Sequence, residues 1–291
     1  MIYPSFPTNK IPFTLVIGIK TNSPQQIKFL AKDSKKPMTY YVNHKGVAKG
    51  YREFELKFPQ VPENLSVAVF NTANGNLPDA SDNSFRVTRF EAVPLKKNPI
   101  WFSKEEDSFI KFARRFCEDA SVLSATTIKN GKKVPSVYRS DDNIFSINYY
   151  DVIQDKNGKI INTPARIGHH SGTIDVSKEA FLRYTVPMRM IILLHEFSHK
   201  WENPKNGRKI NYETGADIAA LYMYLSLGYS EIEAHQAFLT VFKGANNEGN
   251  HKRYLIIRDF IDKYNKGQLP TKGIGSSDTV SNTRKEFSMK N

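Results

Sequence analysis

The chain has almost no cysteine and no long hydrophobic run. Cys117 is the single cysteine among 291 residues, so no disulfide can form within the chain. The longest apolar stretch, Met188–Leu194, contains Arg189 and is much shorter than the ~18 residues that cross a bilayer. Residues 1–20 lack the basic and then apolar segments of a signal peptide. We therefore expect a chain without membrane contact that resides in the cytoplasm or in a particle assembled there.

Acidic residues are few compared with basic ones. The chain has 42 Lys and Arg against 29 Asp and Glu, which gives a formal net charge of +13. Such an excess favours anionic partners, among them nucleic acid. The basic residues form no long block of the kind that marks a nucleic-acid-binding arm. A nucleic-acid-associated protein thus remains one open alternative, which no motif supports.

Helical periodicity is lacking in residues 1–95. Short β-rich segments of mostly alternating character are separated there by turn residues, at Asn22-Ser23-Pro24, His44-Lys45-Gly46 and Asn74-Gly75-Asn76. This spacing predicts a β-sandwich-like domain. Because no cluster of chemically reactive side chains occurs in it, we expect it to serve attachment or recognition.

The pattern changes after residue 95, and the prediction for the whole chain is an α+β fold. Apolar residues at helical spacing follow Ser103, and Ser103 with Glu106 forms a capping box. Short strands come next, followed by helices near 186–202, 212–227, 230–242 and 251–264. We assign this second domain to residues 96–266. The remaining residues, 267–291, form a polar tail that lacks the apolar residues of a core.

One of these helices carries two histidines within an apolar segment, "IILLHEFSHKWENP". His195 and His199 are four residues apart, so they share one face of the helix. Polar side chains in a buried helix need partners. Two histidines at this spacing can hold a metal ion, for which zinc is the usual choice, and Glu196 can then reach a water on that ion.

A zinc site needs a third protein ligand, and the next helix supplies a candidate. Asn211 and Gly228 suit the two ends of this helix. Glu213 and Asp217 share one face of it, and the short linker lets it fold back beside the histidines. We expect Glu213 to be the third ligand and Asp217 to accept a hydrogen bond from a ligating histidine.

The two segments H-E-F-S-H (195–199) and E-T-G-A-D (213–217) together resemble the gluzincin metallopeptidases, in particular the M48-type and minigluzincin enzymes. The resemblance covers roughly residues 140–262. It implies an active-site helix, a glutamate helix, and a small sheet whose edge strand, expected within 165–177, binds the substrate backbone. Such enzymes also use a Tyr, His or Arg to stabilise the transition state, and the candidates in this chain are Tyr150, Tyr212, His251 and Arg253.

The resemblance implies a zinc-dependent metallopeptidase that acts on a protein or peptide and binds one Zn²⁺ ion. Glu196 would be the catalytic base, and His195, His199 and Glu213 would be the ligands. His169 and His170 are adjacent, so in a strand they would point in opposite directions. We expect them to be surface residues or substrate contacts. As a fourth ligand, one of them or His251 would close the site and argue against catalysis.

A second hypothesis is a structural or assembly protein that keeps a peptidase fold. The chain is similar to virion components of tailed, crAss-like phages in its β-rich first domain, its single cysteine and its lack of an export signal. On this interpretation, residues 1–95 and 267–291 contact other chains of a phage particle or tail.

Overall fold

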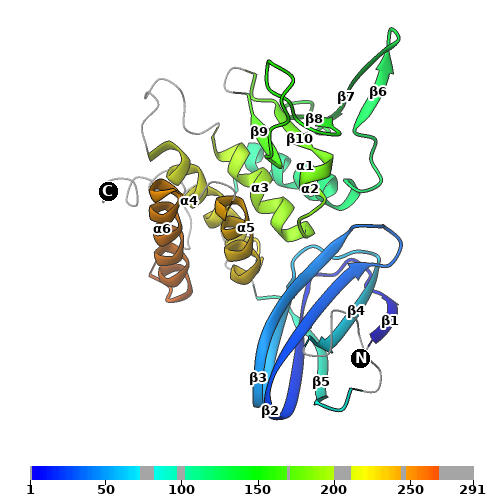
Figure 1. Cartoon of the computed structure of the whole chain (residues 1–291), viewed down its shortest axis with the longest axis vertical. Coiled ribbons are helices and arrows are strands. Elements are labelled where there is room, and N and C mark those ends of the chain that lie inside the picture. The colour runs from blue at the N-terminus through cyan, green and yellow to red at the C-terminus, as the bar shows by residue number, and fades with distance from the viewer. Residues whose placement is uncertain are drawn as a thin grey trace. The chain divides into compact units, whose positions relative to one another are not determined.

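Residues 2–72, 82–96, 102–168, 171–199, 211–243 and 247–268 are described by the computed structural model. The chain divides into two units. The first comprises Met1–Lys97 with Gly228–Ser230, and the second comprises Asn98–Leu227 and Glu231–Asn291. Strands dominate the first unit, whereas the second combines strands and helices (Figure 1). The predicted α+β class is confirmed.

The first unit is built around one long strand, β2 (Phe13–Asp33). β3 (Tyr40–Phe58) pairs with it along its length. On its other side, β5 (Phe85–Pro94) pairs with the first half of β2 and β4 (Asn64–Asn71) with the second half. β1 (Ile2–Pro7) extends the sheet beyond β4, and all these pairs are antiparallel. The five described strands therefore form one connected sheet, whereas a sandwich would consist of two separate sheets.

Two of the predicted turns in this unit are wrong. Asn22-Ser23-Pro24 lies inside β2, where the register with β3 shifts between Thr21 and Gln25. Such a bulge accommodates Pro24, which has no N–H to donate to a ladder. His44-Lys45-Gly46 lies inside β3, opposite Ile27–Phe29. The third predicted turn, at 74–76, lies outside the described residues.

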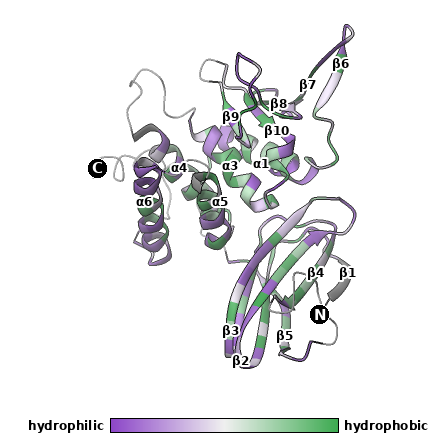
Figure 2. Ribbon diagram, viewed as in Figure 1, coloured by the Kyte–Doolittle hydropathy of each residue, from purple (hydrophilic) through white to green (hydrophobic). Residues whose placement is uncertain are grey.

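A close contact with a neighbouring side chain favours glycine at position 46, which does not mark a turn. A Cβ atom at this position would lie 2.4 Å from Cε1 of Phe54, closer than carbon atoms approach. Buried residues recur along β2 and β4, and the alternation of green and purple along the long strands is visible in Figure 2. The core of this unit includes Leu15, Ile17, Ile19, Ile27, Phe29, Leu56, Phe58, Val67 and Val69.

The sheet of the second unit has the strand order β6-β7-β8-β10-β9. Its strands are β6 (Thr126–Lys129), β7 (Lys132–Arg139), β8 (Ser146–Tyr150), β9 (Ala165–Ile167) and β10 (Ile174–Ser177). β10 runs parallel to β8, and the other pairs are antiparallel. β6 and β9 are its two edge strands.

The edge strand was predicted somewhere within 165–177, and the structure divides this segment in two. Ala165–Ile167 forms β9 at the edge, and Ile174–Ser177 forms β10, which lies inside the sheet between β9 and β8. The amide of Gly168 donates to the carbonyl of Thr173, which closes the connection between the two strands. This edge of the sheet is therefore formed by only the three residues of β9.

Helices make up the rest of the second unit, and all those predicted are present. They are α1 (Lys104–Asp119), the short α2 (Lys178–Phe181), α3 (Val186–Ser198), α4 (Asn211–Ser226), α5 (Glu231–Lys243) and α6 (Glu248–Asn265). Gly228 follows α4 with a positive φ of 90°, a conformation that suits the end of a helix. Within the described residues, no helix has the length and apolar character needed to cross a membrane.

α1 fixes the position of α3 by direct packing. Its predicted capping box is confirmed, since Glu106 N donates to Ser103 Oγ at 3.2 Å and Ser103 N donates to Glu106 Oε2 at 2.6 Å. Phe109 of α1 stacks on Phe197 of α3 with ring centroids 4.3 Å apart and planes 11° apart. Phe197 directly follows Glu196 in the chain, so this contact holds the last turns of α3 against α1.

Arg189 anchors the first half of α3 from within the core. Its side chain is fully buried, and it donates to the carbonyl oxygens of Cys117, Phe181 and Leu182 at 3.1–3.3 Å. These carbonyls lie at the C-terminal ends of α1 and α2, where helical carbonyls lack partners within their own helix. One guanidinium thus joins three helices.

We predict that Arg189→Met destabilises the second unit by at least about 2 kcal/mol, because the substitution leaves buried carbonyl groups without donors. The matched control is Arg183→Met, whose exposed guanidinium pairs with Glu179 and contributes no more than about 1 kcal/mol. Urea unfolding followed by circular dichroism at 222 nm reports this unit, which contains all the described helices. Equal stability of the two variants would contradict the role assigned to Arg189.

Candidate metal centre

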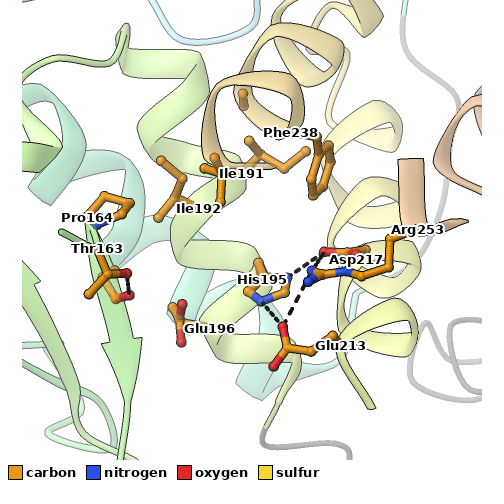
Figure 3. Close-up of a pocket in the computed structure, with 13 residues that line it drawn as sticks. Thr163, Pro164, Ile191, Ile192, His195, Glu196, Glu213, Asp217, Phe238 and Arg253 are labelled. Carbon is orange, nitrogen blue, oxygen red and sulfur yellow. Dashed lines mark hydrogen bonds and ion pairs between the residues drawn. The ribbon is translucent and has the colours of Figure 1, made fainter. Parts of the chain in front are cut away.

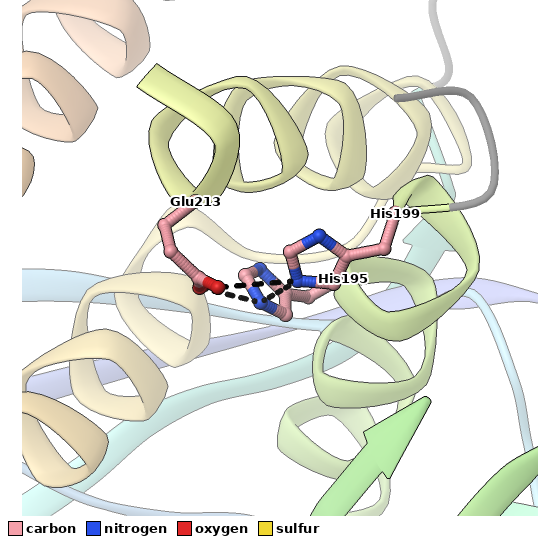
Figure 4. A group of neighbouring side chains, drawn as sticks. All are labelled: His195, His199 and Glu213. Atoms are coloured by element: carbon pink, nitrogen blue, oxygen red, sulfur yellow. Dashed lines mark hydrogen bonds and ion pairs between the residues drawn. The ribbon is translucent and has the colours of Figure 1, made fainter. Parts of the chain in front are cut away.

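Two helices bring three ligand-type side chains together. His195 projects from the last turn of α3, His199 is the C-cap residue of that helix, and Glu213 projects from the first turn of α4 (Figure 4). The two Nε2 atoms are 3.0 Å apart. Glu213 Oε2 lies 3.4 Å from His195 Nε2, and Glu213 Oε1 lies 3.7 Å from His199 Nε2. Among the described residues, this is the one group of three or more such side chains whose donor atoms converge.

These distances match the donor set of a tetrahedral zinc site. Zinc bonds to His nitrogen and carboxylate oxygen are about 2.0–2.2 Å long, which places neighbouring donors roughly 3.3–3.5 Å apart. The observed separations of 3.0, 3.4 and 3.7 Å lie around that value. The three residues fit one zinc ion without rearrangement of the helices.

A buried carboxylate supports His195 from the other side of its ring. Asp217 is fully buried one turn along α4 from Glu213, and its Oδ1 lies 2.9 Å from His195 Nδ1. This interaction directs Nε2 of His195 towards His199 and Glu213. The geometry is the one expected of a carboxylate that orients a metal-binding imidazole.

Asp217 is itself held by Arg253 of α6. The guanidinium donates through Nε to Asp217 Oδ2 at 2.8 Å and through Nη2 to Asp217 Oδ1 at 3.0 Å (Figure 3). Nη2 also lies 3.4 Å from Glu213 Oε2. Such a two-point pair restricts the carboxylate in position and in plane. Three helices are therefore joined through one chain of charged groups.

These contacts control the protonation of the ligands. Burial disfavours the imidazolium form of His195, but Asp217 and Glu213 outweigh burial and raise the pKa of His195 to about 10. Burial also opposes the ionised form of Glu213, yet the two histidines and Arg253 lower the pKa of Glu213 to about 2. At neutral pH the site without a metal therefore contains a carboxylate beside a protonated histidine.

Glu196 lies next to the three converging side chains, on the side that faces β9. Burial raises the pKa of its carboxyl group above the ordinary value, although His195 opposes the shift. Its Oε2 accepts a hydrogen bond of 2.8 Å from the backbone N–H of Ile167 in β9. The edge strand and the H-E-x-x-H helix are thus in direct contact at this carboxylate.

A pocket of about 190 Å³ opens beside these residues. His195, Glu213, Asp217 and Arg253 lie at one end of it, and Glu196 lies between them and Pro164 (Figure 3). No sequence motif marks its other walls, which come from residues 163–165, from α3 before the H-E-x-x-H segment and from α5. The apolar lining consists of Pro164, Ala165, Ile191, Ile192, Ala237, Phe238 and Val241.

The other candidate residues are placed differently. Arg253 lines the pocket and makes two hydrogen bonds to Asp217. Tyr150 of β8 is half-buried and His251 of α6 is exposed, and neither is among the residues that line this pocket. His169, His170 and the side chain of Tyr212 lie outside the described residues.

Comparison with known proteins gave no match among family models, curated proteins or solved structures.

We predict that Asp217→Asn lowers zinc affinity by about 10–100-fold, because the neutral amide supports His195 less strongly than the carboxylate does. Asn keeps the shape of the side chain and so limits damage to the fold. The control is Asp259→Asn, an exposed carboxylate of α6 that pairs with Lys263. Competition with a zinc chelator measures both affinities, and equal values would reduce Asp217 to a helix-packing residue.

A second prediction concerns the number of protons that are released when zinc binds. Because the pKa of His195 is about 10 without metal, its imidazole must lose a proton before Nε2 can bind zinc. Binding at pH 7.5 should therefore release about one proton, and the affinity should fall roughly tenfold for each unit by which the pH is lowered. Calorimetry in two buffers with different ionisation enthalpies counts the protons. Release of none would contradict the raised pKa.

Proposed function

We propose that this chain is a zinc-dependent metallopeptidase that hydrolyses peptide bonds with Glu196 as general base. The observation that carries the proposal is the convergence of His195, His199 and Glu213 beside Glu196. Three protein ligands are typical of catalytic zinc, whereas structural zinc usually has four.

For the metal chemistry, the main contribution of the protein is the set of residues that bind the ion. Zinc in such a site polarises a carbonyl group and lowers the pKa of a water molecule. The role of His195, His199 and Glu213 is to hold the ion. Glu213 has a side chain that is 48 % exposed, so the site is accessible from solvent on this side.

Glu196 has the position and the proton affinity of a general base. It is not one of the converging ligands, yet it lines the same pocket. Burial raises the pKa of its carboxyl group, and a base works best when its pKa lies closer to the working pH. The carboxylate accepts the proton of the attacking water and then donates it to the nitrogen of the leaving amine. The Ile167 amide holds the carboxylate in place during these steps.

The outer edge of β9 suits an extended peptide. Pro164 O and Gly168 N bond to the neighbouring chain segment at Ser177 N and Thr173 O. Because backbone groups alternate in direction along a strand, those of Ala165 and Ile167 point away from β10. Ile167 N–H indeed reaches Glu196. Because Ala165 O accepts from Thr163 Oγ1 at 2.8 Å, a peptide would pair with this edge through Ala165 N–H and Ile167 O. It would then lie directly beside the general base, which favours a peptide substrate over a small amide.

The test is the substitution Glu196→Gln in the full chain. We expect the variant to bind one zinc ion, as the wild type does, and to cleave peptides about 10²–10⁴-fold more slowly, because only the base is lost. Mass spectrometry of a digested peptide library measures cleavage, and elemental analysis measures zinc. Glu248→Gln, an exposed change on α6, is the control.

Two results would overturn the proposal. One is a zinc-loaded wild-type protein that cleaves no peptide in the library. The other is a Glu196→Gln variant that cleaves as fast as the wild type, since Glu196 would then not be the base.

A further inference from the structure

The strands β6 and β7 form an arm that projects from the sheet of the second unit. β6 pairs with residues 132–135 of β7, whereas β8 pairs with residues 136–139, so no third described strand flanks the outer part of the hairpin. Figure 1 shows this part extending beyond the other strands of the unit. Because a hairpin without a further strand is only marginally stable in water, the arm needs other contacts to keep its shape.

Two features give the arm a defined shape. Asn130 and Gly131 have φ values of 52° and 73°, both positive, as a two-residue turn of type I′ requires. Asp151, which directly follows β8, accepts a hydrogen bond from Lys133 Nζ at 2.6 Å and another from Thr126 Oγ1 at 3.4 Å. The turn and the carboxylate therefore hold the two strands of the arm in register.

The two faces of the arm differ in character. Because side chains alternate along a strand and paired residues share a face, Ile128 and Lys133 lie on one face and Lys129 and Lys132 on the other. Ile128 is 78 % exposed, more than any other large apolar residue that the structure describes. Lys129 and Lys132 are directly opposite each other, and such a pair of like charges destabilises a hairpin. Neither the exposed isoleucine nor the lysine pair stabilises the fold.

We propose that the arm binds an extended segment of a partner protein in which acidic and apolar residues alternate. The segment pairs with the open edge of β6, where every second residue directs its backbone groups away from β7. Its apolar side chains contact Ile128, and its acidic side chains contact Lys129 and Lys132. This proposal is independent of the function proposed above.

Charge favours this partner over other occupants of the arm. Lys133 is paired with Asp151, whereas Lys129 and Lys132 form no ion pair among the described residues. A second copy of the chain would bring another basic arm, and residues 267–291 carry four basic against two acidic residues. Nucleic acid would satisfy the lysines through its phosphate groups, but those groups leave the apolar side chain of Ile128 exposed.

The experiment measures fluorescence anisotropy with the full chain and two labelled, capped peptides. In one peptide Glu and Val alternate, and in the other the same residues form a block of Glu followed by a block of Val. We expect the alternating peptide to bind at least about tenfold more tightly, because only its two faces match those of the arm. Mass spectrometry after each titration verifies that the peptide is intact.

Variants of the arm test its two faces separately. Ile128→Ser removes the apolar contact, and the double variant Lys129→Glu with Lys132→Glu reverses the charge of the other face. Each should weaken binding of the alternating peptide at least about fivefold. All three positions are exposed, so these substitutions should leave the fold intact.

The chain offers a matched control for the charge reversal. Lys-Asn-Gly-Lys occurs at residues 129–132 and again at 156–159. In the second copy, Asp155 accepts hydrogen bonds from the backbone amides of Asn157 and Lys159. The double variant Lys156→Glu with Lys159→Glu changes the net charge of the protein by the same amount, and it should bind the alternating peptide as the wild type does.

The outcomes are decisive in both directions. Weaker binding in both arm variants, with unchanged binding in the control, would support the proposal whether or not the protein cleaves peptides. Equal weakening in the control would indicate a general attraction to a basic protein and overturn it. Equal affinity for the two peptides, or wild-type affinity in either arm variant, would overturn it too. So would duplex DNA that binds the arm lysines more tightly than the alternating peptide does, or self-association that Ile128→Ser abolishes in sedimentation experiments.

Discussion

The buried carboxylate of Asp217 is the interaction on which the candidate site depends. It contacts His195 on one side and receives two hydrogen bonds from Arg253 on the other. A fully buried carboxylate is stable only with such partners, so the position of each group requires the other two. The chain of contacts joins the consecutive helices α3 and α4 to α6, which follows them after α5. The direction of the His195 imidazole is therefore set by tertiary structure and does not depend on the local helix alone.

The rest of the second unit keeps α3 in one place. Arg189 binds carbonyl groups at the ends of α1 and α2, and Thr185, the N-cap residue of α3, donates to the buried carboxylate of Glu233 on α5 at 2.8 Å. Phe197 stacks on α1 near the other end of the helix. Since polar contacts and apolar packing both act along its length, α3 can hold the histidines and Glu196 rigidly. Rigid support of this kind is what a preorganised site needs.

Features that depend on local sequence patterns could be predicted from the sequence. The helix of residues 186–198 follows from its apolar pattern and Pro187, and the neighbouring positions of His195, Glu213 and Asp217 follow from helical spacing and a short linker. The turns that were predicted within the long strands are wrong. Residues 22–24 have turn composition, yet the surrounding ladder extends through them with a bulge. The α5 wall of the pocket could not be predicted, because Ala237 and Phe238 fit ordinary helical spacing and only the tertiary fold brings them to α3.

The charges of the site explain why its protonation is unusual. When Glu196, Glu213 and Asp217 are all ionised, they contribute three negative charges, and Arg253 contributes one positive charge. The excess is unfavourable in a partly buried site. Without a metal it is reduced by a proton on His195, whose pKa is raised to about 10, and by the raised pKa of Glu196. A divalent cation at the three converging donors would neutralise the same excess. Proton and metal therefore compete for one place.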